Sequence, residues 1–262
     1  MNFEIIDFHT HPFLEAKENI CQHKELFEMN ADKTTDTFTK LGVSKICGTV
    51  IRRINAGENE TAWECLCECN EKALMLKEQY GDFYIPGFHI HPDYVEESIN
   101  EIRKMSARGI KLIGELVPYM HSWSGYVSNE FSQILDEAQK HKMIVNLHSS
   151  SNDDEMDELL EKHKDVTFVM AHPGEYAQLM RHIERMKKNE NCFLDLSGTG
   201  IFRHGAVRRL IDSVGCDRIL FGSDFPTCNP GMFVGAILFD DLLTDTEKEK
   251  IFSLNAKKLL GL

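Results

Sequence analysis

The chain repeats one pattern eight times: a short apolar run is followed by a longer segment with helical periodicity. Strict alternation of strand and helix predicts a parallel sheet, because a parallel crossover needs a helix-length connection. Eight such units fit within 262 residues, so we expect an α/β fold, a (β/α)8 TIM barrel. The runs cover residues 3–9, 43–50, 83–91, 109–116, 143–148, 166–172, 192–197 and 218–224.

The connecting segments have the composition and periodicity of helices at 61–80, 93–108, 129–140, 153–164, 176–188, 205–214 and 244–260. The first connection, 12–41, is less regular, and we expect one helix in it near 32–41. No linker divides the chain, which predicts a single barrel domain over residues 1–262. The alternative is an open doubly wound sheet, which usually has a Gly-rich phosphate turn after its first strand. That position holds HTHP (9–12), which cannot cradle a phosphate in that way.

Four of the runs carry metal-binding residue types at their ends. His9 and His11 share one face of the first run, because strand side chains alternate. His148 and His172 end the fifth and sixth runs, and Asp224 ends the eighth. In a barrel these ends meet at the C-terminal mouth, where active sites lie. Imidazoles and a carboxylate suit a borderline divalent cation such as Zn²⁺, so a metal site is predicted there.

The charge balance limits the classes of partner. Forty-two acidic against 29 basic residues give a formal charge of −13, which disfavours nucleic acid and anionic membrane surfaces. No apolar run approaches the roughly 20 residues of a membrane span. Eight cysteines in a chain of this length, with no signal peptide apparent, predict reduced thiols and a cytoplasmic location. We expect a small-molecule substrate, and the sequence leaves association into a homo-oligomer open.

Six segments together carry a resemblance to a known family: IIDFHTHP (5–12), VNLH (145–148), VMAHPG (169–174), FLDLSG (193–198), RILFGSDFP (218–226) and the tail IFSLNAKKLLGL (251–262). With them the sequence resembles the amidohydrolase superfamily, in the branch called amidohydrolase 2, which includes amidohydrolases, lactonases and ACMSD-like decarboxylases. The resemblance implies that His9, His11, His148 and Asp224 surround the metal. It also implies that Asp224 accepts a proton from the attacking water and that His172 is a second-site ligand or a catalytic group.

The fourth run determines whether one or two ions are expected. Lys111 and Glu115 share a face of this run, and Glu115 lies nearer the mouth. The superfamily also uses a carboxylated lysine here, but Lys111 lies deeper, so we favour Glu115 as a ligand. Without a bridging group the site holds one ion, and His172 is free to polarise the substrate. With Glu115 as the bridge, the ligands divide into His9, His11 and Asp224 for one ion and His148 and His172 for the other.

Three further residues are predicted near the substrate. His89 and His91 end the third run on a shared face, and we expect them to contact the substrate or support the ligands. Packing histidines are the alternative. Arg52, which follows the second run beside Arg53, is expected to bind a substrate carboxylate bidentately, with a surface ion pair as the alternative.

These features favour a metal-dependent hydrolase that uses a metal-activated water to cleave an amide, lactone or other ester bond in a small molecule. Its expected cofactor is one or two divalent ions, with zinc favoured. The alternative is a non-hydrolytic, metal-dependent decarboxylase of the ACMSD-like type, which a single ion and an arginine holding a carboxylate would favour. A third hypothesis, from another class, is a barrel that binds a metal or ligand without turnover.

Overall fold

The computed structural model describes residues 3–21, 30–54 and 60–262. Its eight strands are parallel and adjacent in chain order. The predicted (β/α)8 barrel is therefore confirmed. The strands are β1 (Ile5–Thr10), β2 (Val43–Gly48), β3 (Tyr84–Phe88), β4 (Leu112–Leu116), β5 (Ile144–His148), β6 (Thr167–Ala171), β7 (Cys192–Asp195) and β8 (Ile219–Leu220).

The barrel is nearly closed between its first and last strands. β8 is only two residues long, and one isolated parallel bridge joins Thr10 to Phe225. Three backbone hydrogen bonds reinforce this junction, from Phe8 N to Phe221 O at 2.9 Å, from His11 N to Phe225 O at 2.6 Å and from Asp224 N to His9 O at 2.8 Å. The junction therefore brings His9 and Asp224 together through the main chain.

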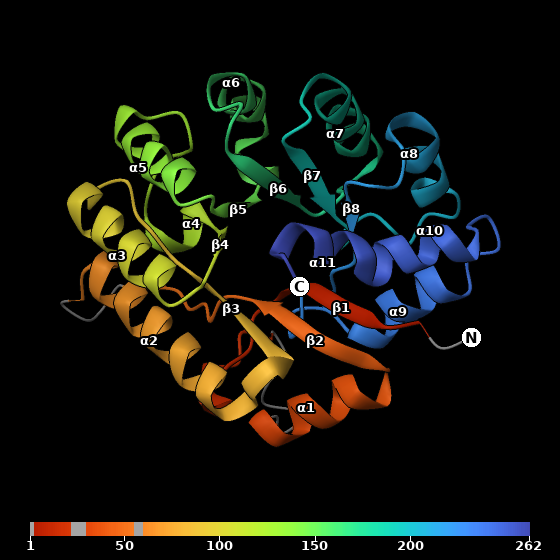
Figure 1. Ribbon diagram of the computed structural model, residues 1–262, viewed down its shortest axis with the longest axis horizontal. Coiled ribbons are helices and arrows are strands. Elements are labelled where there is room, and N and C mark those ends of the chain that lie inside the picture. The colour runs from red at the N-terminus through yellow and green to blue at the C-terminus, as the bar shows by residue number, and fades with distance from the viewer. Residues whose placement is uncertain (1–2, 22–29, 55–59) are drawn as a thin grey trace.

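Helices surround the strands (Figure 1). Each long helix is amphipathic and buries one face: α5 buries Phe131, Ile134, Leu135 and Ala138. The helices are α1 (Ala31–Lys40), α2 (Ala62–Tyr80), α3 (Val95–Ala107), α4 (Pro118–His121), α5 (Asn129–Lys140), α6 (Met156–Lys162), α7 (Tyr176–Lys188), α8 (Ala206–Val214), α9 (Pro230–Leu238), α10 (Asp245–Glu249) and α11 (Asn255–Leu260), with short turns η1 (Ala16–Glu18), η3 (Gly81–Phe83), η4 (Ser150–Glu155) and η5 (Lys250–Leu254).

The helical prediction was incomplete in two places. α9 was not predicted, because its sequence PGMFVGAIL is apolar all round and lacks the stripe of an amphipathic helix. Its start is nevertheless specified locally: Asn229 caps it by accepting from Gly231 N at 2.9 Å, and Pro230 occupies the first turn. α4 has four residues, which is too short to show a period. The helix predicted at 153–164 is divided into η4 and α6, and the helix predicted at 244–260 is divided into α10, η5 and α11.

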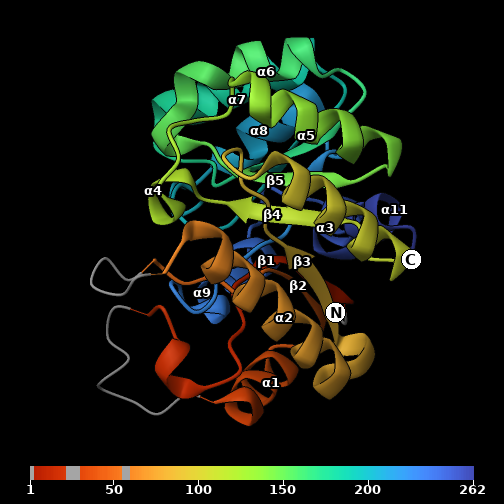
Figure 2. The ribbon, with the colours of Figure 1, turned by 90° about the vertical axis from the view of Figure 1, so that its left-hand side faces the viewer.

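The carboxyl ends of the strands open at one end of the barrel. Figure 2 shows α4, which follows β4, on the opposite side of the molecule from the two termini. Residues placed just after a strand therefore share the end that carries α4.

In the described part of the chain, no helix combines the length and the apolar character needed to cross a bilayer.

The closing helix is attached to the last strand by one buried amide, which gives a test of the fold. Asn255 is 5% exposed, and its side-chain N–H groups donate to Cys216 O at 2.7 Å and Ile219 O at 2.8 Å. Asn255→Ala leaves both carbonyls without these donors, so we expect the free energy of unfolding to fall by about 1–3 kcal/mol. Urea denaturation followed by circular dichroism measures the change. Lys258→Ala, on the exposed side of the same helix, should change the value by less than about 0.5 kcal/mol; equal effects of the two variants would contradict the assignment.

Candidate metal centre

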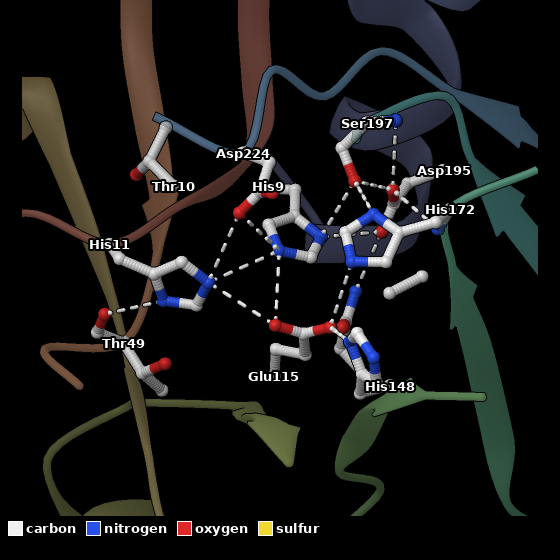
Figure 3. A network of polar contacts seen from close by, with 12 residues as sticks. His9, Thr10, His11, Thr49, Glu115, His148, His172, Asp195, Ser197 and Asp224 are labelled. Atoms are coloured by element: carbon white, nitrogen blue, oxygen red, sulfur yellow. Dashed lines mark hydrogen bonds and ion pairs between the residues drawn. The ribbon is translucent and has the colours of Figure 1, made fainter. Parts of the chain in front are cut away.

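Two imidazoles meet where β1 ends. The Nε2 atoms of His9 and His11 are 3.3 Å apart (Figure 3). Their other ring nitrogens face groups that only accept: His9 Nδ1 lies 2.9 Å from Asp195 Oδ2, and His11 Nδ1 lies 3.1 Å from Thr49 O. Each Nδ1 therefore carries a hydrogen, and in the neutral rings both Nε2 atoms present lone pairs to the same point.

Glu115 lies at the centre of the cluster, and each of its oxygens faces a different pair of histidines. Oε2 is 3.2 Å from His11 Nε2 and 3.4 Å from His9 Nε2. Oε1 is 2.8 Å from His148 Nδ1 and 3.3 Å from His172 Nε2. The carboxylate is 5% exposed, so water does not screen these contacts effectively. Lys111, in contrast, is exposed and precedes β4.

Asp224 completes the cluster from the other side of the barrel junction. Its Oδ1 lies 3.6 Å from His11 Nε2 and 3.8 Å from His9 Nε2. Asp224 has a φ of 60° and His172 a φ of 67°, a left-handed conformation that is uncommon for residues other than glycine. Such backbone strain concentrates at functional sites, and here it occurs at two of the clustered side chains.

Asp195 and Ser197, at the end of β7, orient two of the histidines. Asp195 Oδ2 accepts from His9 Nδ1 and, at 3.0 Å, from Asn146 Nδ2. The Ser197 hydroxyl donates to Asp195 Oδ1 and lies 3.0 Å from His172 Nδ1, from which it can then only accept. His172 therefore also has its hydrogen on Nδ1, and its Nε2 lone pair faces Glu115.

Burial and charge shift the protonation of this cluster strongly. Burial would raise the pKa of Glu115, but the charges of His9 and His148 outweigh it and hold that pKa well below its ordinary value. Burial would lower the pKa of His9, but Asp195 and Glu115 raise it well above its ordinary value. Asp195 has a pKa lowered to about 2, since the charge and hydrogen bond of His9 overcome the effect of burial. The buried carboxylates therefore require positive charge close by.

These donors fit a divalent cation. Within the described residues, the candidate ligand atoms of His9, His11 and Glu115 lie within 4.8 Å of one another, and so do those of Glu115, His148 and His172. In metal sites, an acceptor commonly binds the N–H of one ring nitrogen of a histidine and so leaves the lone pair of the other nitrogen for the metal. The histidines here have that arrangement, and anionic carboxylates lie beside them. A divalent metal in this cluster is therefore chemically plausible, and the shared Glu115 gives room for one ion or two.

A cavity of about 360 Å³ opens over the cluster. Its wall includes His11, Glu115, His148, His172 and Asp224, so the clustered side chains reach it directly. A cavity of this size suits a small molecule. The remaining wall combines apolar residues with polar ones and one charged residue: Ile20, Ile51, Val117, Tyr119, Met120, Ser150, Gly174, Glu175, Gln178, Gly198, Thr199, Thr227 and Cys228.

The three residues predicted to contact substrate lie elsewhere. His89 Nε2 is 2.8 Å from Val50 O, and His91 Nε2 is 2.9 Å from His121 O. The guanidinium of Arg52 binds the carboxylate of Glu60, with one contact at 2.8 Å, so it forms the ion pair that was the alternative. None of the three belongs to the described wall of the cavity. Contact with substrate stays a prediction for them.

Sequence reasoning missed three positions that shape the cluster. A Cβ on Gly198, whose φ is 62°, would lie 2.3 Å from His172 Nδ1, and one on Gly222 would lie 2.8 Å from the Cβ of His9. Gly198 directly follows the seventh apolar run (192–197) and Gly222 lies near the end of the eighth (218–224), and this position was the available signal. Thr49 contributes through its carbonyl, so its side-chain identity carries no signal.

Comparison with known proteins gives a family and a fold. The family model described as Amidohydrolase matches residues 6–262. Among solved structures, an uncharacterized TIM-barrel protein from Bordetella bronchiseptica is 18% identical, with 98% of each chain covered and a TM-score of 0.77. The 2,6-dihydroxybenzoate decarboxylase from Rhizobium is 15% identical, with 100% of this chain and 99% of that chain covered and a TM-score of 0.72. No curated protein sequence matches.

A third structure bears on the metal. The 5-carboxyvanillate decarboxylase from Novosphingobium aromaticivorans, complexed with manganese and 4-hydroxy-3-methoxy-5-nitrobenzoic acid, is 14% identical, with 99% of this chain and 96% of that chain covered and a TM-score of 0.71. At such identities the likeness is one of fold.

The contact between Asp195 and His9 gives a test of the centre. Asp195→Asn replaces an acceptor by an amide that can donate to His9 Nδ1, so His9 is no longer held with its lone pair on Nε2. We expect the affinity for Zn²⁺ to fall about 10–100-fold, measured by competition with a chromophoric chelator. Asp154→Asn, at an exposed aspartate, should bind as the wild type does. Unchanged affinity in Asp195→Asn would show that Asp195 does not support a metal ligand.

Proposed function

The chain belongs to the amidohydrolase family, and on that premise we propose that it is a metal-dependent hydrolase that cleaves an amide, lactone or other ester bond in a small molecule. One observation carries the proposal: the two oxygens of Glu115 face two different pairs of imidazoles. A carboxylate in that position suits a bridge between two divalent cations, for which we propose zinc. Two ions bridged in this way favour hydrolysis over decarboxylation.

The proposed ligands divide at Glu115. His9, His11 and Asp224 would hold one ion with Oε2, and His148 and His172 would hold the other with Oε1. Such ions would supply positive charge that polarises a carbonyl and acidifies water at the centre. The chain itself fixes the ring orientations, through Asp195, Ser197 and the carbonyl of Thr49.

Asp224 is the proposed general base. Its carboxylate lies on the cavity wall, beside the imidazoles of His9 and His11, so it is within reach of water that attacks a bound substrate. It would take a proton from that water and deliver it to the leaving nitrogen or oxygen, which is the transfer that both amide and ester cleavage need. Because Asp224 N donates a hydrogen bond to His9 O, the barrel junction fixes the position of this base relative to the ligands.

Decarboxylation is the second candidate function. It is favoured by the named decarboxylases among the similar structures and by Arg53, whose guanidinium lies 5.5 Å from the centre of the Tyr119 ring on the cavity wall. Against it, the described wall includes no arginine, and Arg52 is engaged with Glu60. A carboxylate substrate would lack a direct guanidinium partner on that wall, so we prefer hydrolysis.

Metal stoichiometry tests the bridge. We expect two equivalents of zinc in the reconstituted protein and at most one in Glu115→Ala, because the only carboxylate shared by the two histidine pairs in the described cluster is removed. Elemental analysis after gel filtration gives the count. Glu137→Gln, which alters a buried carboxylate paired with Arg103, should keep both ions. One equivalent in the wild type that stays one in Glu115→Ala would defeat the bridging role.

Turnover tests the base. Asp224→Asn should lower kcat by about 10²–10⁴-fold while the melting temperature stays near that of the wild type, since the change removes the proton acceptor and little volume. The assay is a panel of small amides, lactones and hydroxybenzoates, read by product chromatography and by CO2 release. Asp241→Asn, an exposed aspartate, should retain full activity.

The same panel separates the alternatives. Retained activity in Asp224→Asn would overturn the mechanism. CO2 release by the wild type would favour decarboxylation. Tight metal binding without turnover of any compound would favour a binding protein.

A further inference from the structure

Three of the four residues that follow β2 (49–52) have their carbonyls held by imidazoles instead of by neighbouring strands. The Thr49 carbonyl accepts from His11 Nδ1 at 3.1 Å, the Val50 carbonyl from His89 Nε2 at 2.8 Å and the Arg52 carbonyl from His121 Nε2 at 3.2 Å. Among the described residues, the backbone–backbone hydrogen bonds other than those within helices and strands include none from or to residues 49–52. Because buried carbonyls need partners, these histidines supply what the sheet does not.

His89 is itself held firmly. The side-chain amide of Asn70, on α2, accepts from His89 N at 2.7 Å and donates to His89 O at 3.1 Å. The imidazole is 1% exposed, and its Nδ1 is buried without a hydrogen-bond partner among the described residues. The ring does not belong to the described wall of the cavity, but it can transmit the position of α2 to Val50.

His121 extends the same arrangement to the loop after β4. Its ring packs edge-on against that of His89, with centroids 5.1 Å apart. Its own carbonyl accepts from His91 Nε2 at 2.9 Å. The loops after β2, β3 and β4 are therefore joined by imidazole-to-carbonyl hydrogen bonds, and we call His89, His91 and His121 the histidine strap.

The strap ends next to the candidate metal centre. Thr49 O is the group that keeps the hydrogen of His11 on Nδ1 and leaves Nε2 for the cluster (Figure 3). Val50 is adjacent to Thr49 in the chain, so the hydrogen bond from His89 to Val50 O holds the peptide next to the one whose carbonyl orients His11. Ile51, one residue further on, is part of the cavity wall.

We infer that His89 and His121 are positioning residues, which hold segment 49–52 so that the Thr49 carbonyl sets the tautomer and orientation of His11. This inference rests on the proposed function, in which His11 is a metal ligand. For His89 it gives a role in supporting a ligand, which is the other part of the sequence-based prediction for this residue.

The test compares variants that lose or keep the N–H donor. His89→Met removes the donor at similar size, whereas His89→Gln keeps an N–H that reaches about as far as Nε2. We expect His89→Met to weaken binding of the first Zn²⁺ about 10–100-fold in chelator competition and His89→Gln to stay close to the wild type. His121→Met and His121→Gln form a second pair, in case His89→Met does not fold. His163→Met is the control for a general loss of stability, because His163 is a buried histidine whose hydrogen bond, to Ser132, lies in another part of the barrel.

The second measurement needs no metal. Long-range ¹H–¹⁵N correlation spectra of apo protein labelled at histidine report the tautomer of His11, identified by its loss in His11→Gln. The wild type should show one tautomer, with hydrogen on Nδ1, and the Met variants a mixture. Equal zinc affinity in the Met and Gln variants, or an unchanged His11 tautomer, would overturn the inference. Absence of zinc binding in the wild type would count against the proposed function instead, and the spectra would still decide the role of the strap.

Discussion

The arrangement of the mouth depends on one buried carboxylate. Glu115 is surrounded by four imidazoles and is only 5% exposed, so its negative charge must be compensated by groups the barrel places around it. Burying a charge costs free energy unless hydrogen bonds and opposite charge accompany it. The surrounding residues therefore have to be positioned accurately, and much of the polar structure at this end of the barrel does that.

That accuracy is provided by a second layer of acceptors. Asp195, Ser197 and the Thr49 carbonyl each face the far nitrogen of an imidazole, so the near nitrogens are free to bind. The histidine strap forms a third layer, which supports one of those acceptors from outside. The site is thus built outward from a carboxylate through imidazoles to main-chain carbonyls, and each layer restricts the one inside it.

The sequence predicted the barrel and the positions of its principal polar side chains, because both follow from periodicity and from residue types at strand ends. His9, His11, Glu115, His148, His172 and Asp224 meet in one cluster for that reason. The roles of Thr49 and Gly198 were not predicted, since one acts through its main chain and the other through the absence of a side chain. His89 and Arg52 carry side chains suited to substrate binding, but the contact of His89 with Val50 joins distant segments, and the periodicity of a single sequence does not choose between substrate binding and the ion pair with Glu60 for Arg52.

The junction between the first and last strands has a consequence for how the site comes into existence. His9 belongs to β1, the first of the eight strands to be synthesised, whereas Asp224 follows β8, the last, and the main-chain contacts between them require both. During synthesis the early histidines therefore remain without their final carboxylate partner until nearly the whole barrel has emerged. The centre is completed by the same event that closes the barrel, so a chain stalled before its last strand would be unable to assemble it.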